Sequence, residues 1–283
     1  DSKILTADAH GKGSLLSEAN LMSIIFNTVD RKPDDLAALL YTSGTTGRSK
    51  GAMLTQNNLL SNAKTLKKLW QVTKSDILIH ALPIFHTHGL FVALNTAMLA
   101  GAKVNFIPKF DIDEIIERLH ASTLLMGVPT FYTRLLADYR LTEKLTKNMR
   151  LFISGSAPLL SETHEEFTKR TGHHILERYG MTETNMITSN PYHGERRPGT
   201  VGKPLADVQM KITDPETGKE MVEGKIGMIE VRGPNVFKGY WNMPDKTALE
   251  LRETGYFITG DLGKLSSDGY LSIAGREKDL IIS

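Results

Sequence analysis

Short segments that are apolar along their whole length alternate with helix-like segments through the first two thirds of this sequence. The apolar segments lie at residues 36–42, 76–82, 103–108, 122–128, 150–155 and 174–180. The helix-like segments lie at residues 55–70, 89–100, 111–120, 130–140 and 161–171. Strands that are apolar throughout are typical of a parallel sheet covered on both faces. The sequence therefore predicts an α/β fold with a mostly parallel sheet layered with helices, in which residues 36–42 form a buried strand.

The pattern changes near residue 190. Residues 190–204 (NPYHGERRPGTVGKP) are rich in glycine and proline, which is typical of turns. Short alternating segments follow, and they favour a small antiparallel β subdomain. We therefore expect two domains, with residues 1–190 forming the α/β part and residues 191–283 forming the β-rich part.

Composition excludes several classes of function. The 34 basic residues nearly balance the 32 acidic ones and form no long run, which argues against a nucleic-acid partner. The absence of cysteine excludes disulfides, thiolate metal sites and a cysteine nucleophile from this segment. The longest apolar stretch, residues 89–102, is too short to span a bilayer, so we expect a buried helix, no membrane partner and a cytoplasmic location. The ends suggest a segment of a longer chain, since the sequence starts without methionine and stops within an apolar run.

Residues 41–51 (YTSGTTGRSKG) combine hydroxyl groups, glycines and a lysine in one short segment. Glycine lets backbone N–H groups approach an anion, hydroxyls donate to it, and lysine adds positive charge. The segment therefore predicts a phosphate-binding loop, with a ligand-free connection between strand and helix as the alternative. It does not have the Walker spacing, because Gly44 and Gly47 are too close and Lys50 stands three residues beyond Gly47.

Seven motifs, in one order, resemble those of the adenylate-forming acyl-CoA synthetase superfamily. They are YTSGTTGRSKG (41–51), LPIFHTHGL (82–90), SGSAPL (154–159), ERYGMTET (177–184), VRGPNVFKGYWNMPDKT (231–247), GYFITGDLG (255–263) and GREKDLI (275–281). The resemblance implies an AMP-forming acid–thiol ligase that uses ATP, Mg²⁺ and coenzyme A. Such an enzyme joins a carboxylate to AMP, releases pyrophosphate, and then passes the acyl group to the thiol.

The resemblance also implies roles for individual residues. Phosphate contacts fall to Thr42, Ser43, Gly44, Thr45, Thr46, Gly47 and Lys50. The other nucleotide contacts fall to Ser156, Ala157, Pro158, Glu177, Tyr179, Gly180, Met181, Thr182, Asp261 and Arg276. Among them, Tyr179 packs on adenine, while Asp261 and Arg276 meet the ribose. Glu183 holds Mg²⁺ and, with Thr182 and Lys50, is implied to be catalytic. Lys278 matches the hinge to a C-terminal lid that lies beyond residue 283.

Arg178 is the residue that bears on the identity of the acid. Relatives that activate fatty, aryl or acetyl groups usually carry a small residue there, at the border of the acyl pocket. A buried unpaired guanidinium is costly, whereas one that meets a second carboxylate forms charge-assisted hydrogen bonds. Arg134, His86 and His88 add further candidate contacts on the acyl side. The form ERYGMTE resembles malonyl-CoA synthetases, so the sequence predicts a small dicarboxylate, malonate or methylmalonate, as the substrate.

Several alternatives stay open at this point. Arg178 could instead form an internal salt bridge, for example with Glu177, and Arg134 could lie on a solvated helix face. The acid could be another short carboxylate. The chain could also be an amino-acid adenylation module, although we find no clear aspartate for an α-amino group. Finally, the family's catalytic lysine lies in the lid, so we expect this segment alone to bind nucleotide weakly and turn over poorly.

Overall fold

A computed structural model describes residues 3–8, 10–42 and 49–279. The chain divides into two units, residues 1–32 and residues 33–283. The first unit contains one short helix, α1 (Ser14–Ala19), which buries none of its residues. The second unit contains all the other described helices and strands.

A seven-stranded sheet forms the centre of the larger unit, with the strand order β4-β3-β5-β6-β7-β8-β9. Its strands are β3 (Ile77–His80), β4 (Lys103–Phe106), β5 (Leu124–Gly127), β6 (Leu151–Ser154), β7 (Leu176–Met181), β8 (Asn185–Ser189) and β9 (Lys203–Pro204). The five strands from β4 to β7 are parallel, which confirms the predicted α/β fold. The antiparallel strands β8 and β9 extend this sheet across the predicted domain boundary at residue 190, and that boundary stays a prediction.

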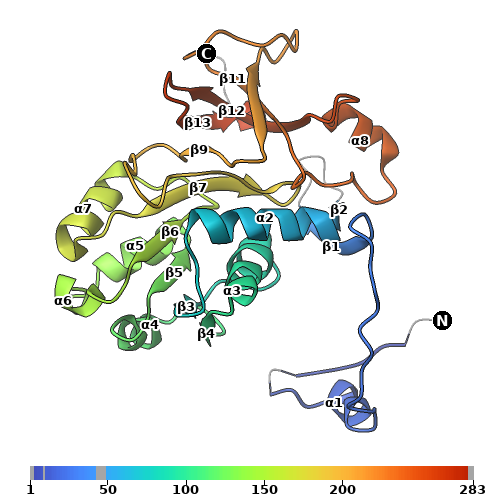
Figure 1. The fold of residues 1–283 in the computed structure, drawn as a ribbon, viewed down its shortest axis with the longest axis vertical. Coiled ribbons are helices and arrows are strands. Elements are labelled where there is room, and N and C mark those ends of the chain that lie inside the picture. Colours follow the sequence, from blue (N-terminus) through green and yellow to red (C-terminus); the bar gives the residue numbers. More distant parts are fainter. Residues whose placement is uncertain (1–2, 9, 43–48, 280–283) are drawn as a thin grey trace. The chain divides into compact units, whose positions relative to one another are not determined.

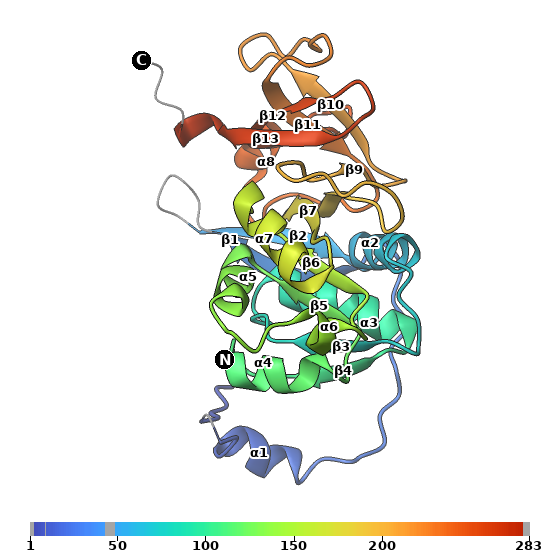
Figure 2. The same cartoon turned by 90° about the vertical axis from the view of Figure 1, so that its left-hand side faces the viewer.

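Helices cover both faces of the sheet (Figures 1 and 2). One face carries α2 (Gln56–Leu69), the π-helix η1 (His88–Leu94) and α3 (Asn95–Ala100). The other face carries α4 (Ile112–Leu119), α5 (Pro129–Leu136) and α7 (Ser161–Thr171), with the short α6 (Glu143–Thr146) between α5 and β6. Thr55 caps the N-terminus of α2, because its side chain accepts from the Asn58 backbone N–H and the Asn58 side chain accepts from the Thr55 N–H in return.

Aromatic side chains fill the layer between the sheet and α5 and α7. The ring of Phe167 lies 4.9 Å from that of Phe152 and 5.4 Å from that of Tyr132, in edge-on arrangements that aromatic pairs prefer. The buried Tyr132 hydroxyl is satisfied, since it donates to the Ile153 carbonyl oxygen at 2.5 Å. This packing fixes β6 against its helices and so fixes the loop that follows β6.

The prediction of a buried strand at residues 36–42 was only half right. These residues do form a strand, β1 (Leu36–Thr42), but Leu36, Leu39 and Tyr41 are exposed. The reason is that β1 pairs with β2 (Lys50–Thr55) in a separate two-stranded antiparallel sheet and does not enter the parallel sheet. The turn between β1 and β2 falls outside the described residues.

The predicted antiparallel β part is confirmed as a four-stranded sheet at one end of the larger unit (Figure 2). Its strands, in spatial order, are β10 (Gln209–Thr213), β11 (Gly227–Arg232), β12 (Phe257–Leu265) and β13 (Leu271–Arg276). The helix α8 (Pro244–Glu250), which the sequence did not predict, joins β11 to β12, and a single turn, η2 (Glu277–Asp279), follows β13.

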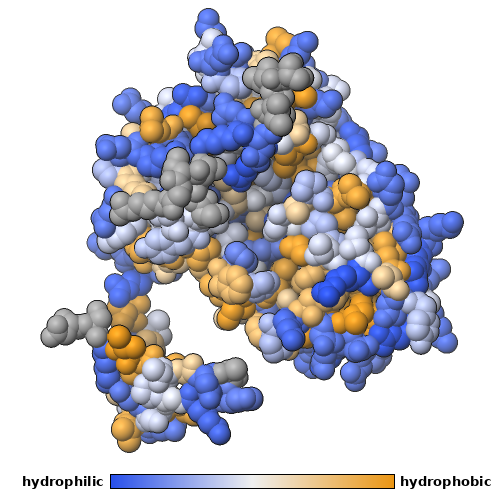
Figure 3. Space-filling model, turned by 180° about the vertical axis from the view of Figure 1, so that it is seen from behind, coloured by the Kyte–Doolittle hydropathy of each residue, from blue (hydrophilic) through white to orange (hydrophobic). Residues whose placement is uncertain are grey.

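The surface is mixed in character. Hydrophobic residues form scattered patches among hydrophilic ones on the face shown in Figure 3, as is normal for a folded protein. Among the residues that the structure describes, no helix has the length and apolar character needed to cross a membrane.

Candidate functional site

A cavity of about 920 Å³ opens where the parallel strands of the large sheet end. The strand order reverses at β3, which has β4 on one side and β5 on the other. Ligands of open α/β sheets bind at the carboxyl ends of the strands beside such a reversal. The segments that follow β3, β5, β6 and β7 reach the cavity with His88 at the start of η1, Phe131 on α5, Ser156 and Thr182, respectively. The topology alone therefore places the site here.

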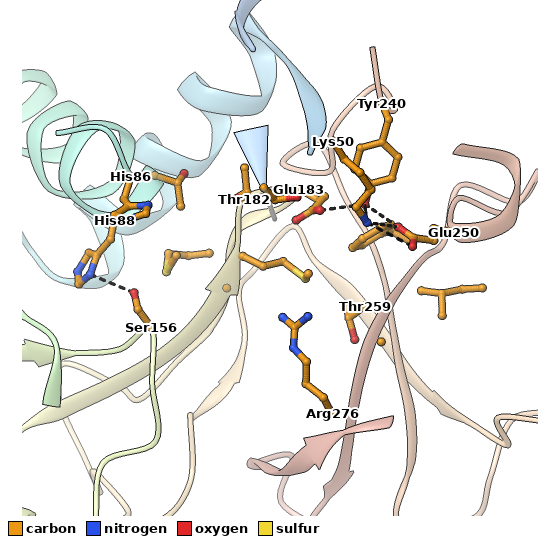
Figure 4. A pocket seen from close by; sticks show the side chains of 18 of the residues that line it. Lys50, His86, His88, Ser156, Thr182, Glu183, Tyr240, Glu250, Thr259 and Arg276 are labelled. Atoms are coloured by element: carbon orange, nitrogen blue, oxygen red, sulfur yellow. Dashed lines mark hydrogen bonds and ion pairs between the residues drawn. The ribbon is translucent and has the colours of Figure 1, made fainter. Parts of the chain in front are cut away.

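Most of the predicted site residues that the structure describes line this cavity (Figure 4). Those that line it are Thr42, Lys50, His86, His88, Ser156, Arg178, Gly180, Met181, Thr182, Glu183 and Arg276, together with Lys278. The predicted phosphate contacts Ser43, Gly44, Thr45, Thr46 and Gly47 lie outside the described residues. The two described ends of that loop, Thr42 and Lys50, both reach the cavity wall.

Tyr179 and Asp261 lie just behind the cavity wall and are joined to Arg276. The Tyr179 hydroxyl donates to Oδ2 of Asp261 at 2.5 Å, and Nε of Arg276 lies 3.0 Å from Oδ1 of the same carboxylate. Burial raises the pKa of Asp261, against the opposing effects of the Tyr179 hydrogen bond and the Arg276 charge. One carboxylate thus connects β7, β12 and β13 at the edge of the cavity, where vicinal hydroxyls of a ligand could also donate to it.

Glu183 is buried at the cavity wall and meets residues from two distant segments. Its Oε1 lies 2.8 Å from the Tyr240 hydroxyl, which also lies 2.6 Å from Oε2 of Glu250 on α8. Lys50 completes the group, with Nζ 3.1 Å from the Tyr240 hydroxyl and 3.3 Å from Oε2 of Glu250. Burial raises the pKa of Glu183 even though the Tyr240 hydrogen bond opposes it.

Arg178 is the most unusual group in the cavity. Its side chain is buried, with 2% of the residue exposed, and Nε has no hydrogen-bond partner among the described residues. Among the side chains that the structure describes, its guanidinium has one hydrogen-bond partner, Oγ of Ser156, at a long 3.5 Å. Burial lowers its pKa to about 9, and a guanidinium with that value is still charged at neutral pH.

The alternative of an internal salt bridge for Arg178 is contradicted for the described part of the chain. Glu177 points elsewhere, with Oε1 3.4 Å from Nδ1 of the buried His164 on α7. No other described carboxylate forms an ion pair with Arg178. Gly155 instead leaves room for the guanidinium, because a Cβ at that position would lie 2.4 Å from its Cζ. The positive charge is therefore held at the cavity without a described anion.

Two histidines of the predicted acyl side line the cavity in different ways. His88 is buried, with Nδ1 3.4 Å from Oγ of Ser156 and with Nε2 unpaired among the described groups. Burial, and then the charge of Arg178, hold its pKa well below the usual value, so the ring is neutral at pH 7. His86 is exposed and packs on the ring of Phe85 at 4.6 Å.

Besides Tyr179 and Asp261, four described residues among the predicted contacts do not line the cavity. Arg134 is exposed on α5, with its guanidinium 4.7 Å from the centre of the Phe110 ring, as on a solvated helix face. Ala157 and Pro158 are exposed beyond Ser156, and the Glu177 side chain turns toward α7. Their roles in binding stay predictions.

The sequence-based reasoning missed Tyr240, Lys246, Glu250 and Thr259, all of which line the cavity. Tyr240 lies within the motif at residues 231–247, so the motif itself was a signal that was not used. Glu250 follows that motif and carries no pattern of its own. It reaches the site because α8 folds back beside β2.

The donor set fits Mg²⁺ that is bound with a nucleotide. Mg²⁺ prefers oxygen ligands and in such sites uses one or two carboxylates together with phosphate oxygens. The described residues contain no group of three or more side chains able to hold a metal, so the protein does not supply a complete cage. Glu183 supplies a buried carboxylate at the wall, and the raised pKa reflects a negative charge that a cation would stabilise.

Comparison with known proteins gives consistent results. The family model described as AMP-binding enzyme matches residues 3–241. A malonate–CoA ligase from Arabidopsis thaliana is 41% identical over 263 residues, which cover 86% of this chain and 43% of that protein. The chain thus spans about half the length of the curated relatives that it matches.

Solved structures agree with this finding. The ATP-bound crystal structure of MatB from Rhodopseudomonas palustris is 61% identical, with a TM-score of 0.97, and the match covers 99% of this chain and 56% of that one. A malonyl-CoA ligase ternary product complex with methylmalonyl-CoA and AMP is 40% identical, with a TM-score of 0.81, and the match covers 87% of this chain and 54% of that one.

Proposed function

This chain belongs to the AMP-binding enzyme family, and on that premise we propose that it is the central part of a malonate–CoA ligase. The reaction would convert malonate, ATP and coenzyme A into malonyl-CoA, AMP and pyrophosphate, with methylmalonate as a second acid. The observation that carries the choice of a diacid is the buried Arg178, a charged group at the cavity wall without a described carboxylate partner. The names of the relatives support the same choice.

In the first step, a carboxylate oxygen of malonate attacks the α-phosphorus of ATP, and the bond to the leaving pyrophosphate breaks. Negative charge grows on the phosphate oxygens, so the protein's part is to position them and offset that charge. Lys50 and Thr182 would face these oxygens, Asp261 with Arg276 would hold the ribose, and Glu183 would hold Mg²⁺. When bound, the metal would neutralise phosphate charge.

In the second step, the sulfur of coenzyme A attacks the acyl carbon, and AMP leaves. The carboxylate nucleophile of the first step needs no base at pH 7, because its ordinary pKa lies near 4. The neutral His88 ring therefore serves better as a hydrogen-bond donor or as part of the pocket wall than as a base. Its unpaired Nε2 is available for that contact among the described groups.

The second carboxylate of malonate would lie against the planar fork of Arg178. A guanidinium and a carboxylate form two parallel charge-assisted hydrogen bonds, which give orientation as well as affinity. An acid with an apolar tail would leave the same guanidinium buried and unpaired, at a cost of several kcal/mol. This difference in free energy is the proposed basis for choosing a diacid.

Two other acids define the alternatives. Another short carboxylate would use the same nucleotide site with a different acyl pocket. An amino acid would need a carboxylate for its α-amino group, and the described cavity residues after β3, β5 and β6 include no acidic residue. The cytoplasm is the location that we propose, since a chain without cysteine has no need of an oxidising compartment.

The test is ATP–pyrophosphate exchange with the full-length protein and a panel of acids: malonate, methylmalonate, succinate, acetate, butyrate and an aromatic acid. We expect malonate to lead and Arg178→Ala to lose it selectively. Arg134→Ala tests the second predicted arginine, and Arg118→Ala, on α4 outside the cavity, controls for the loss of one charge. If acetate or butyrate leads and Arg178→Ala changes little, the diacid proposal is refuted while the family assignment stands.

A further inference from the structure

Two lysines and two glutamates meet around one tyrosine hydroxyl at the cavity wall (Figure 4). Lys50 contacts Glu250 at 3.3 Å, and Lys246 contacts the same carboxylate at 2.7 Å. The Tyr240 hydroxyl oxygen lies between the carboxylates of Glu250 and Glu183, within hydrogen-bond distance of both. The group joins β2, the residues that follow β7, and α8, all of which belong to one structural unit. Its most distant members in the sequence, Lys50 and Glu250, are 200 residues apart.

Backbone contacts hold Tyr240 in this place. The Trp241 N–H donates to the Gly51 carbonyl at 2.8 Å, so the tyrosine segment runs along β2 beside Lys50. The Tyr240 N–H donates to Oγ1 of Thr247 on α8 at 2.9 Å, which ties the same segment to the helix that carries Glu250. The meeting of Lys50 with Glu250 is therefore built into the fold, and the aromatic ring supports it, with Nζ of Lys50 4.4 Å from the ring centre.

The Lys50–Glu250 pair is shielded from water. The side chains of Lys50 and Glu250 are 15% and 22% exposed, so solvent screens their attraction less than that of a surface pair. Burial raises the pKa of Glu250, but hydrogen bonds from Lys246 and Tyr240 and the charge of Lys50 outweigh it and leave the pKa below the usual value. The Glu250 carboxylate is therefore ionised at neutral pH, and its negative charge offsets much of the positive charge of Lys50.

The charges at this wall have a consequence for an anionic ligand. The charges of the two lysines and two glutamates sum to zero, so these four side chains together offer a metal-free triphosphate no net attraction. A tyrosine hydroxyl has one proton and can donate to only one of its two carboxylate neighbours, so the other carboxylate lacks that hydrogen bond. A divalent cation reverses this balance, because it attracts both the carboxylates and the phosphates.

We propose that Glu250 is a specificity-determining residue that makes nucleotide binding depend on the divalent cation. By engaging Lys50, it prevents the lysine from holding a metal-free triphosphate alone, and it adds a repulsive charge that the metal offsets. The site thereby selects the metal-complexed nucleotide and rejects the free one, which is discrimination by a repulsive element. This inference rests on the proposed function, in that ATP is the ligand of the cavity.

The test is calorimetric titration of the full-length protein with ATP, once with excess Mg²⁺ and once with EDTA. Glu250→Gln keeps the size of the side chain and can still accept from Tyr240, but it removes the charge. We expect the variant to bind ATP about tenfold more tightly in EDTA, as the loss of one repulsive charge at short range implies. In Mg²⁺ we expect a change of less than about threefold, so that the ratio of the two Kd values shrinks.

Glu253→Gln is the matched control, since it removes the same charge from an exposed position just beyond α8 that does not line the cavity. We expect both of its Kd values to equal those of the unchanged protein. The inference is overturned if Glu250→Gln binds metal-free ATP no more tightly, or if Glu253→Gln has the same effect. An unchanged protein that binds ATP in neither buffer would overturn the proposed function itself, whereas unchanged behaviour of the variant alone overturns only the role of Glu250.

Discussion

Replacing Arg178 by methionine should make the acid-free protein more stable while destroying its ability to use malonate. Burial lowers the pKa of Arg178 to about 9. Against an ordinary value of about 12.5, this corresponds to a cost of about 5 kcal/mol for keeping the charged form in the fold. Because both the folded and the unfolded chain carry this charge below pH 9, the cost is fully present at neutral pH, and it falls only as the pH rises above 9.

Methionine has a similar length and no charge, so replacing Arg178 by methionine removes part of the free-energy cost of burying the guanidinium. Replacement of even a paired buried charge by apolar side chains of similar volume is often neutral or stabilises a protein by about 1–4 kcal/mol, and an unpaired charge lacks the attraction that offsets its burial. We therefore expect Arg178→Met to raise the free energy of unfolding by that amount. The same change removes the guanidinium that we propose as the partner of malonate's second carboxylate. We therefore expect malonate-dependent pyrophosphate exchange to fall at least about a hundredfold, which corresponds to roughly 3 kcal/mol.

The assay compares urea unfolding midpoints at pH 7 with exchange rates for malonate and butyrate. Arg150→Met is the control, because Arg150 is half-buried but, unlike Arg178, has a carboxylate partner, with Nη2 2.7 Å from Oδ2 of Asp76. We expect that control to unfold at lower urea and to keep its preference for malonate. The reasoning is refuted if Arg178→Met is destabilised like the control, or if its rates with malonate and butyrate fall by the same factor.

Three further changes test other parts of the structure. Gly155→Ala should reduce malonate exchange about tenfold or more and spare butyrate, since its Cβ would lie 2.4 Å from Cζ of Arg178 and displace the guanidinium; the same acid panel measures this. Asp261→Asn should weaken ATP binding by about tenfold, as measured by calorimetry. The unchanged protein should bind 2′,3′-dideoxy-ATP, which lacks both ribose hydroxyls, more weakly than ATP, whereas the variant should bind the two nucleotides equally. Burial raises the pKa of Asp76, but hydrogen bonds and charge from Arg150 outweigh it and lower the pKa to about 2, so this carboxylate stabilises the fold above pH 4 and loses that effect as the pH falls toward 2. Asp76→Asn should therefore cost roughly 2 kcal/mol at pH 7 and much less near pH 2.5, as measured by urea unfolding at both values.

The parallel sheet was predictable because its strands are apolar on both faces. β5 and β6 are buried at every position, and a continuous apolar run is the sequence pattern of such a strand. The same pattern misled at β1, where an apolar run proved to be an exposed strand of a separate hairpin. Burial at β1 depends on which surface covers it, and a single strand's composition does not carry that information.

The site was predictable where one motif supplies neighbouring residues and unpredictable where distant segments meet. Thr182 and Glu183 follow β7 directly, so the motif and the end of a parallel strand both point to them. Glu250 meets Lys50 only through the fold of α8 against β2. Arg134 is turned outward in this structure although its helix begins beside the cavity, so its contact with the acid stays a prediction.

The strand β7 shows how one short motif would serve the two proposed ligands, the acid and the nucleotide. Consecutive side chains of a strand point to opposite faces. Arg178 points toward Ser156 and the acyl side, whereas Tyr179 points toward Asp261 on β12 and the expected ribose. In the proposed function, the strand would separate the acid from the nucleotide by one residue, and the register of β7 against β6, with Glu177 opposite Ser154, keeps each side chain on its own face. A shift of one residue would exchange the two faces and place the guanidinium where the nucleotide is expected, so the proposed choice of acid would depend on the register of the sheet as much as on Arg178 itself.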